Sequence, residues 1–198
     1  VPDYASRVGL VGAAISDHPK LPELLARLVE NGKGVGVSSL RADRIARKPL
    51  LAKLLRQGGY KTLTVASDAA SHRLRKTISK GTLEKHLISC AEQAAEHKYK
   101  LLKIYMMLGL PNEQDEDIDE LIRFCTEISK IHPIALGIAP FVPKKNTPMD
   151  QDTFAGIKVV EKKLKKLENI KIPKEFEFEK LHSISTEGRQ KLTMIGPS

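Results

Sequence analysis

The chain has 198 residues, of which 41% are hydrophobic and 29% charged, and this composition is typical of a globular protein with one well-packed core. No apolar run approaches the roughly 20 residues that a membrane-spanning helix needs, and no secretory signal opens the chain, so we expect a cytoplasmic protein without membrane contact. The 33 basic and 24 acidic residues give a net charge of +9, which would attract nucleotides or RNA from a distance.

The chain opens with a segment that we place outside the fold. Residues 1–7 resemble the end of a haemagglutinin epitope tag followed by a cloning junction. After it, continuous apolar runs predict strands at residues 8–14, 35–38, 62–66, 104–108 and 133–139. An amphipathic helix follows each strand, with apolar residues at three- and four-residue spacing on one face.

The strand at 104–108 leads into the most informative loop. Gly109 and Pro111 end the strand abruptly, and the acidic residues within 113–117 open a helix, whose N-terminus favours negative charge. Gly109 directly after a strand indicates either a positive φ angle or a ligand close to the backbone. The residues alone leave both interpretations open.

Five apolar strands that alternate with helices predict an α/β fold with parallel pairing and right-handed crossovers. Because the strands are apolar throughout, we expect both of their faces to be covered, as in a barrel or a doubly wound sheet. Either architecture places the ligand-binding loops at the carboxyl ends of the strands. We assign residues 8–169 to this domain.

Residues 170–198 depart from the repeat. Ile170, Ile172, Phe176 and Phe178 alternate with polar residues, which predicts an edge strand or a hairpin with one face in water. Residues 181–198 have no clear period. They are partly disordered, an extension added by cloning, or a partner strand, and the sequence leaves these alternatives open.

Two groups of side chains resemble binding sites but have a plainer interpretation. Cys90 and Cys125 fall on apolar helix faces far apart in the sequence, so we interpret them as core thiols in a reducing compartment. Four lysines crowd one helix, at positions 162, 163, 165 and 166. A solvated helix face explains them, and contact with RNA phosphates is the alternative.

Five segments, each following a predicted strand, form a series. They are Val-Ser-Ser-Leu-Arg-Ala-Asp at 37–43, Lys-Thr-Leu-Thr-Val-Ala with the following acid at 61–68, residues 73–80, Gly-Leu-Pro-Asn-Glu within 103–113, and Pro-Phe-Val-Pro within 140–148. Together they resemble the radical S-adenosylmethionine superfamily, in particular its methylthiotransferase-like and cobalamin-associated branches. The resemblance covers residues 8–148. It implies a partial parallel (β/α) barrel, with about five of the family's six β/α units, followed here by a C-terminal β segment.

The resemblance implies a site for S-adenosylmethionine at the carboxyl edge of the sheet. Gly109 would lie against this cofactor, and Asp68 resembles an acidic residue that holds its methionine or ribose part. The family commonly has Pro-Glu-Ala-Gly where this chain has Ser-Asp-Ala-Ala at 67–70. Ser39 and Arg41 would face the same cavity. Arg41 would pair with a carboxylate or phosphate, with a salt bridge at a helix start as the alternative.

Four further residues complete the candidate cofactor site. Pro140 and Phe141 belong to it through the fifth matching segment. Tyr105 and Met107 lie on the strand before Gly109, where they either pack inside the barrel or line the cofactor.

The family's Cys-x-x-x-Cys-x-x-Cys loop, which holds a four-iron four-sulfur (4Fe-4S) cluster, has no match in this sequence. In the family this loop follows the first barrel strand, so the chain resembles strands two to six of a parent enzyme. The parent would use S-adenosylmethionine and the cluster to form a 5′-deoxyadenosyl radical that takes a hydrogen atom from substrate. We expect the chain alone to bind neither cofactor, to supply no metal ligand and to be inactive.

Two functions of other classes are also open. One is a basic module that binds nucleotides or RNA without catalysis, and the other is a self-associating folded fragment. If the first barrel unit is missing, the strand at 8–14 has a free edge of unpaired amides, which favours a homodimer or a higher oligomer. RNA or a small molecule would be the substrate of the parent.

Overall fold

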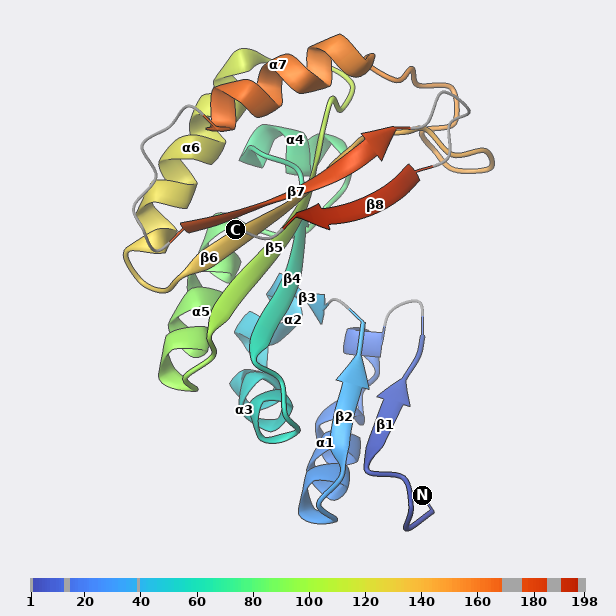
Figure 1. Ribbon diagram of the computed structural model, residues 1–198, viewed down its shortest axis with the longest axis vertical. Coiled ribbons are helices and arrows are strands. Elements are labelled where there is room, and N and C mark those ends of the chain that lie inside the picture. Colours follow the sequence, from blue (N-terminus) through green and yellow to red (C-terminus); the bar gives the residue numbers. More distant parts are fainter. Residues whose placement is uncertain (1, 13–14, 39, 169–175, 185–189, 196–198) are drawn as a thin grey trace.

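The computed structural model describes residues 2–12, 15–38, 40–168, 176–184 and 190–195. Two sheets carry the strands (Figure 1). The smaller sheet pairs β1 (Arg7–Leu10) in parallel with β2 (Gly34–Val37). The larger sheet runs in the order β3 (Leu40–Arg41), β4 (Thr62–Asp68), β5 (Leu101–Leu108), β6 (Ile134–Pro140), β7 (Phe176–Ile184), β8 (Gln190–Ile195). All its neighbouring strands are parallel except β7 and β8, which are antiparallel.

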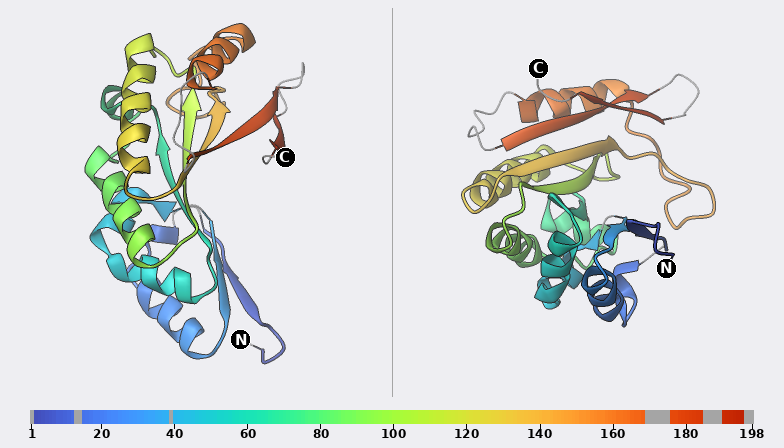
Figure 2. Two further views of the ribbon diagram at one scale, coloured as in Figure 1. Left: turned by 60° about the vertical axis from the view of Figure 1, so that its left-hand side comes forward. Right: turned by 60° about the horizontal axis from the view of Figure 1, so that its bottom comes forward.

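The helices connect the strands and lie mainly on one side of them. They are the 3-10 helix η1 (Ile15–Asp17) and α1 (Leu21–Glu30), α2 (Ala42–Arg47), α3 (Pro49–Gln57), α4 (His72–Thr77), α5 (Glu84–Glu96), α6 (Asp115–Ser129) and α7 (Ile157–Glu168). Figure 2 shows α1, α3, α5 and α6 along the convex face of the curved sheet, with the concave face free of these helices. The predicted α/β fold with a partial parallel barrel is therefore confirmed. None of the described helices is long and apolar enough to cross a membrane.

The central strands alternate between buried and partly exposed residues. On β5, Leu102, Ile104, Met106 and Leu108 are buried, and the residues between them are partly exposed. β4 follows the same pattern, because successive side chains point to opposite faces of a sheet. The buried set faces the helices and the other set lines the concave face. We expected both faces to be covered, and the inner-face residues of β4 and β5 are partly exposed among the described residues.

Several element boundaries differ from those that we predicted. Arg7, which we placed in the linker, is the first residue of β1, and β1 ends at Leu10 because its partner β2 ends at Val37. The predicted single helix after residue 42 is two helices. Pro49 begins the second, and the residue before a proline disfavours helical backbone, as Lys48 shows with φ −131° and ψ 74°. The two-residue strand β3 lies in what we predicted to be a loop.

The C-terminal segment forms a hairpin at one end of the larger sheet. β7 begins at Phe176 and pairs with β6 on one side and β8 on the other, so the edge strand is β8. Ile170 and Ile172 lie outside the described residues. We left three alternatives open for residues 181–198, one of which was a partner strand. The described part of this segment forms the end of β7 and all of β8, which pair with each other.

The smaller sheet meets the larger one without a ladder of backbone hydrogen bonds between β2 and β4. In its place the hydroxyl of Tyr60 accepts a hydrogen bond from the Val37 amide and donates one of 2.9 Å to the Val37 carbonyl. A pocket of about 230 Å³ lies beside this break, with Ser38, Tyr60 and Tyr105 among its lining residues. On the other side, β1 pairs only with β2 among the described strands. Self-association through the outer edge of β1 stays a prediction.

Candidate functional site

A partly exposed ion pair lies at the carboxyl end of β4. The last residue of β4, Asp68, has a φ angle of 64°, and the pairing of β4 with β5 shifts register just before it. The Asp68 carboxylate pairs with the Lys80 ammonium group, and their side chains are 31% and 24% exposed. This pair therefore presents one negative and one positive group to solvent at the edge where parallel α/β folds bind ligands.

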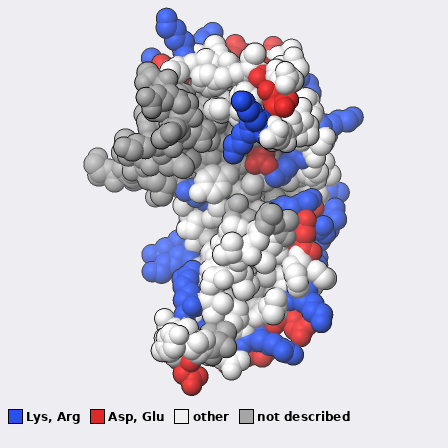
Figure 3. All heavy atoms as spheres, turned by 90° about the vertical axis from the view of Figure 1, so that its right-hand side faces the viewer, with Lys and Arg blue, Asp and Glu red and all other residues white. Residues whose placement is uncertain are grey.

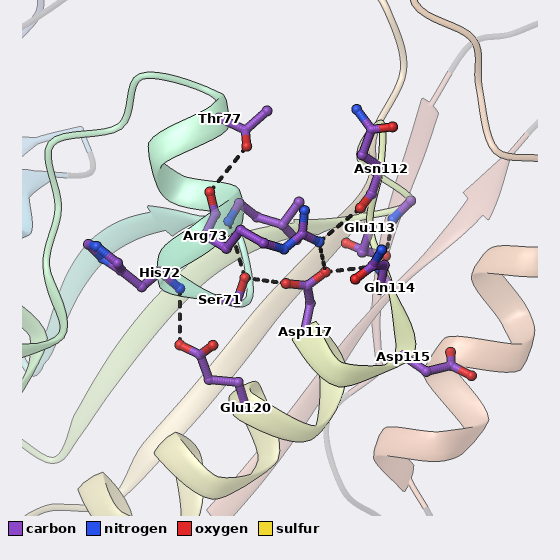
Figure 4. A network of polar contacts seen from close by, with 12 residues as sticks. Ser71, His72, Arg73, Thr77, Asn112, Glu113, Gln114, Asp115, Asp117 and Glu120 are labelled. Carbon is purple, nitrogen blue, oxygen red and sulfur yellow. Dashed lines mark hydrogen bonds and ion pairs between the residues drawn. The ribbon is translucent and has the colours of Figure 1, made fainter.

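The loop that carries Asp68 is fixed to helix α6 by a buried carboxylate (Figure 4). Ser71, the N-cap of α4, donates its hydroxyl hydrogen to Asp117 and accepts a bond of 3.1 Å from the Leu74 amide. Asp117 also pairs with the guanidinium group of Arg73 and accepts a 2.7 Å bond from the Gln114 amide. One carboxylate thus joins the N-termini of α4 and α6.

Burial alone would raise the pKa of Asp117, but hydrogen bonds from Ser71, Gln114 and Arg73 outweigh it, so the pKa lies below its ordinary value. Two neighbouring contacts strengthen the same junction. Arg73 donates to the Asn112 carbonyl at 2.9 Å, and the His72 amide donates to Glu120 at 3.0 Å. These contacts join the β4–α4 loop to the β5–α6 loop at the carboxyl edge of the sheet (Figure 4).

Gly109 ends β5 with a φ angle of 79°, so the first of our two interpretations applies. Its amide donates a 2.8 Å bond to the Glu113 carboxylate, which is 1% exposed and pairs with Lys163 of α7 at 2.5 Å. A Cβ atom on Gly109 would lie 3.1 Å from the Ala155 Cβ and 3.2 Å from a Val160 methyl group. The close approach to Gly109 is therefore made by α7 and the residues before it.

We expect the Gly109→Ala substitution to lower the free energy of unfolding by about 2 kcal/mol or more, because a left-handed φ costs an L-residue about 1–2 kcal/mol and α7 leaves little room for the new methyl group. Urea denaturation measures the change. Gly59→Ala is the matched control, since Gly59 has a φ of 95° and open space around it. An equal loss in both variants would show that α7 does not crowd Gly109.

The guanidinium group of Arg41 forms a bidentate ion pair with the carboxylate of Asp43. Its Nε and Nη2 atoms donate to the two oxygens of Asp43 at 3.0 and 3.1 Å, and Nη1 lies 3.4 Å from Asp17. Asp17 also accepts a 2.9 Å bond from Arg44. The salt bridge at a helix start, which we left open as the alternative for Arg41, is thus present. Ser39 lies outside the described residues.

The remaining candidate residues divide between the concave face and the core. Tyr105 and Met107 are partly exposed on β5, and the Tyr105 ring covers Gly137, where a Cβ would lie 2.5 Å from the ring. Pro140 ends β6 opposite Leu108 of β5. Phe141 is only 5% exposed and donates its amide to the Leu108 carbonyl at 2.8 Å, so it belongs to the core.

Strand pairing shows which candidate residues come together. Arg41 pairs with Ala66, Asp68 with Met106, and Leu108 with Pro140, so the ends of β3 to β6 meet at one edge of the sheet. The candidate residues of these strands therefore share one edge, apart from Tyr105, which lies further back on β5. Lys80 was not singled out from the sequence, although it ends a segment that matched the family.

The family model for the radical SAM superfamily matches residues 2–125 of this chain, which is more than half of it. The chain belongs to the radical SAM superfamily. The match begins at residue 2 and so includes most of the segment that we set aside as a linker. The methylthiotransferase-like and cobalamin-associated branches stay predictions.

One relative is similar over most of this chain. The chain is 33% identical over 185 residues to an uncharacterized protein of Methanocaldococcus jannaschii, a match that covers 90% of this chain and 39% of that protein. The chain thus spans about two fifths of the length of this relative.

Two solved structures share the fold. Coproporphyrinogen III oxidase (HemN) from Escherichia coli, described as a radical SAM enzyme, has a TM-score of 0.59 at 12% identity, over 82% of this chain and 39% of that one. Streptococcus suis SuiB has a TM-score of 0.54 at 16% identity, over 89% of this chain and 40% of that one. At these identities the likeness shows the architecture alone.

The thiols of this radical SAM chain do not fit an iron–sulfur cluster. Cys90 and Cys125 are buried, and burial raises the pKa of each thiol to about 12, whereas cluster ligands must be thiolates. Within the described residues no group of three or more His, Cys, Asp or Glu side chains could hold a metal ion. Both cysteines lie in the core, as we predicted.

The lysine-rich helix α7 contributes to packing in this radical SAM chain. Lys163 is 9% exposed and is paired with Glu113, and Lys166 pairs with Asp119 at 2.7 Å. Two of the four lysines are therefore engaged by carboxylates of the chain. Figure 3 shows one further face, on which basic and acidic side chains are intermixed in the upper part and along the margins, and the middle of the lower part carries few charges. RNA binding stays a prediction.

Proposed function

We propose that this chain forms the wall of a radical SAM active site that binds the methionyl end of S-adenosylmethionine. The observation that carries the proposal is the Asp68–Lys80 pair at the carboxyl end of β4. The methionyl end is a zwitterion, with an ammonium group that suits a carboxylate and a carboxylate that suits an ammonium group. Both protein groups are partly exposed, so the ligand can reach them without unfolding the loop.

The surroundings of the pair support this assignment. The adjoining concave face carries a small residue, Ala66 on β4, two residues before Asp68, and this residue leaves room for a ligand beside the ion pair. SuiB, which shares the fold, has been crystallised with S-adenosylmethionine. When bound, S-adenosylmethionine supplies the reactive sulfonium centre. In this arrangement Asp68 and Lys80 orient the ligand at its amino-acid end.

The proposal assigns no chemical step to the cluster, because the described residues do not fit it. We propose that these residues form one part of a longer catalytic unit and are inactive alone. The 39% coverage of the relative from M. jannaschii supports this. We therefore expect the purified chain to contain no iron and to bind an added S-adenosyl ligand weakly.

The test compares two thioethers that differ in the amino-acid end. S-adenosylhomocysteine carries the zwitterion, and 5′-methylthioadenosine lacks it. Ligand-observed NMR titration of the chain should show S-adenosylhomocysteine binding about tenfold tighter or more, because each charge-assisted hydrogen bond contributes about 1.5–3 kcal/mol. The Asp68→Asn and Lys80→Gln variants should each lose most of this preference.

Arg27→Gln is the matched control, since Arg27 forms an exposed ion pair with Glu23 on α1, distant from β4 in Figure 1. It should retain the preference. Equal affinity of the unmodified chain for the two thioethers would contradict the proposed role of the ion pair.

A further inference from the structure

We propose that Arg75 is the positioning residue that sets the geometry of the Asp68–Lys80 pair. This inference rests on the proposed function and adds a residue that touches neither the ligand nor the ion pair. Arg75 lies on α4 and is 2% exposed. It contacts the chain on both sides of the pair, through its side chain on one side and its backbone on the other.

The side chain of Arg75 holds the loop that carries Asp68. Its Nη1 atom lies 3.2 Å from the Ala70 carbonyl and 3.4 Å from both the Ala69 carbonyl and the Ser67 hydroxyl. The Ser67 hydroxyl also donates to the Ala69 carbonyl at 3.1 Å. The acceptors thus lie on both sides of Asp68 in the sequence, and one guanidinium group fixes the left-handed turn at that residue.

The backbone of Arg75 holds the residue that carries the positive charge. The Lys80 amide donates a 2.8 Å bond to the Arg75 carbonyl, and the Ser79 amide donates to the Lys76 carbonyl at 3.0 Å. Ser79 has a φ angle of 54°, so the end of α4 forms a Schellman motif in which Lys80 is the second residue beyond the C-cap, Ile78. This turn directs the chain back toward β4, where Lys80 meets Asp68.

The surroundings of Arg75 are unusual for a buried charge. Among the described residues no carboxylate lies within ion-pair distance of it, and its Nε atom is buried without a hydrogen-bond partner. Burial lowers the pKa of Arg75, which means that the charged form is disfavoured there. An apolar residue would fill the same space at lower cost. The guanidinium group, unlike an apolar residue, can donate to the acceptors in the Asp68 loop.

The experiment uses the full chain and the two thioethers defined above. In Arg75→Met, affinity for 5′-methylthioadenosine should stay within about twofold, whereas the preference for S-adenosylhomocysteine should fall about tenfold. Arg75→Lys should recover part of the preference, because an ammonium group can still donate to some of the three carbonyl and hydroxyl acceptors. A purely structural role would weaken both ligands together or neither.

The outcomes separate this inference from the proposed function. If Asp68→Asn loses the preference and both Arg75 variants keep it, Arg75 has no positioning role and the proposed function stands. If the unmodified chain shows no preference, both proposals fail. If Arg75→Met does not fold, the inference is tested on the unmodified chain. The NMR signals of the Arg75 Nε–H and the Lys80 amide should shift when S-adenosylhomocysteine is added and should not shift when 5′-methylthioadenosine is added. Unchanged signals overturn the inference.

Discussion

The Lys163→Met substitution is expected to lower the free energy of unfolding by about 3–5 kcal/mol, because removal of one partner leaves the other charge buried. Glu113 is 1% exposed and the Lys163 side chain 11%. The Lys163 ammonium group lies 2.5 Å from one Glu113 oxygen, and the other oxygen is buried without a hydrogen-bond partner. Without Lys163 this carboxylate keeps only the Gly109 amide among its described partners. Urea denaturation at neutral pH measures the loss.

Two variants show whether the buried pair causes this loss. Lys162→Met changes the exposed neighbour on the same helix and should alter stability by less than about 0.5 kcal/mol. The double variant Lys163→Met/Glu113→Gln should regain part of the loss, since a neutral amide still accepts from Gly109 but carries no charge. A similar effect of Lys162→Met and Lys163→Met would show that the pair contributes nothing beyond an exposed lysine.

The second large effect is expected at the junction of α4 and α6. Asp117→Ala should lower the free energy of unfolding by about 2–3 kcal/mol at pH 7, mainly because the buried Ser71 hydroxyl loses its acceptor and a buried donor left unpaired costs about 1–3 kcal/mol. The Arg73 guanidinium group and the Gln114 amide also lose a partner, but the Arg73 side chain is 46% exposed, so water can replace the carboxylate there. Glu116→Ala is the control in the same helix turn. It removes an exposed acid and should cost about 0.3–1 kcal/mol through the helix dipole.

The pH dependence of this effect has a defined sign. The pKa of Asp117 is lowered in the folded chain, so its contribution is complete above the unfolded pKa of about 3.9 and is lost as the pH falls through the folded value. The difference between the unmodified chain and Asp117→Ala should therefore shrink below about pH 4. Chemical denaturation at several pH values measures it. A difference that stays constant into strong acid would mean that the carboxylate charge has no part in the junction.

Local patterns were sufficient to predict the central strands and the positive φ of Gly109. The strands are continuous apolar runs, and a glycine at a strand end has few structural explanations. Pro49 could also have shown the break between α2 and α3. The partial exposure of the concave face was not predicted, because the sequence does not distinguish an apolar strand residue that is fully buried from one, such as Tyr105, that is partly exposed.

The charged part of the site was harder to predict, because it depends on contacts between distant segments. Lys80 meets Asp68 only after α4 has ended and the chain has turned back, and no spacing rule joins residues 12 positions apart in this way. Nothing in the sequence distinguishes Arg75 from the other basic residues of α4, yet it is 2% exposed. Lys163 likewise does not stand out within a lysine-rich helix. In each case tertiary packing decided the role of a basic side chain.

β2 and β4 belong to different sheets, so the distance between them is not set by a ladder of backbone hydrogen bonds. Neighbouring strands of the larger sheet are held at a fixed separation of about 4.8 Å by their backbone hydrogen bonds. At the break between β2 and β4, the Val35 amide of β2 donates a 3.0 Å bond to the Gly58 carbonyl, and beyond it the contact with Val37 is made by the side chain of Tyr60. The carboxyl end of β2 is thus held to the larger sheet by one side chain, whereas neighbouring strands within the larger sheet are held by a ladder of backbone bonds.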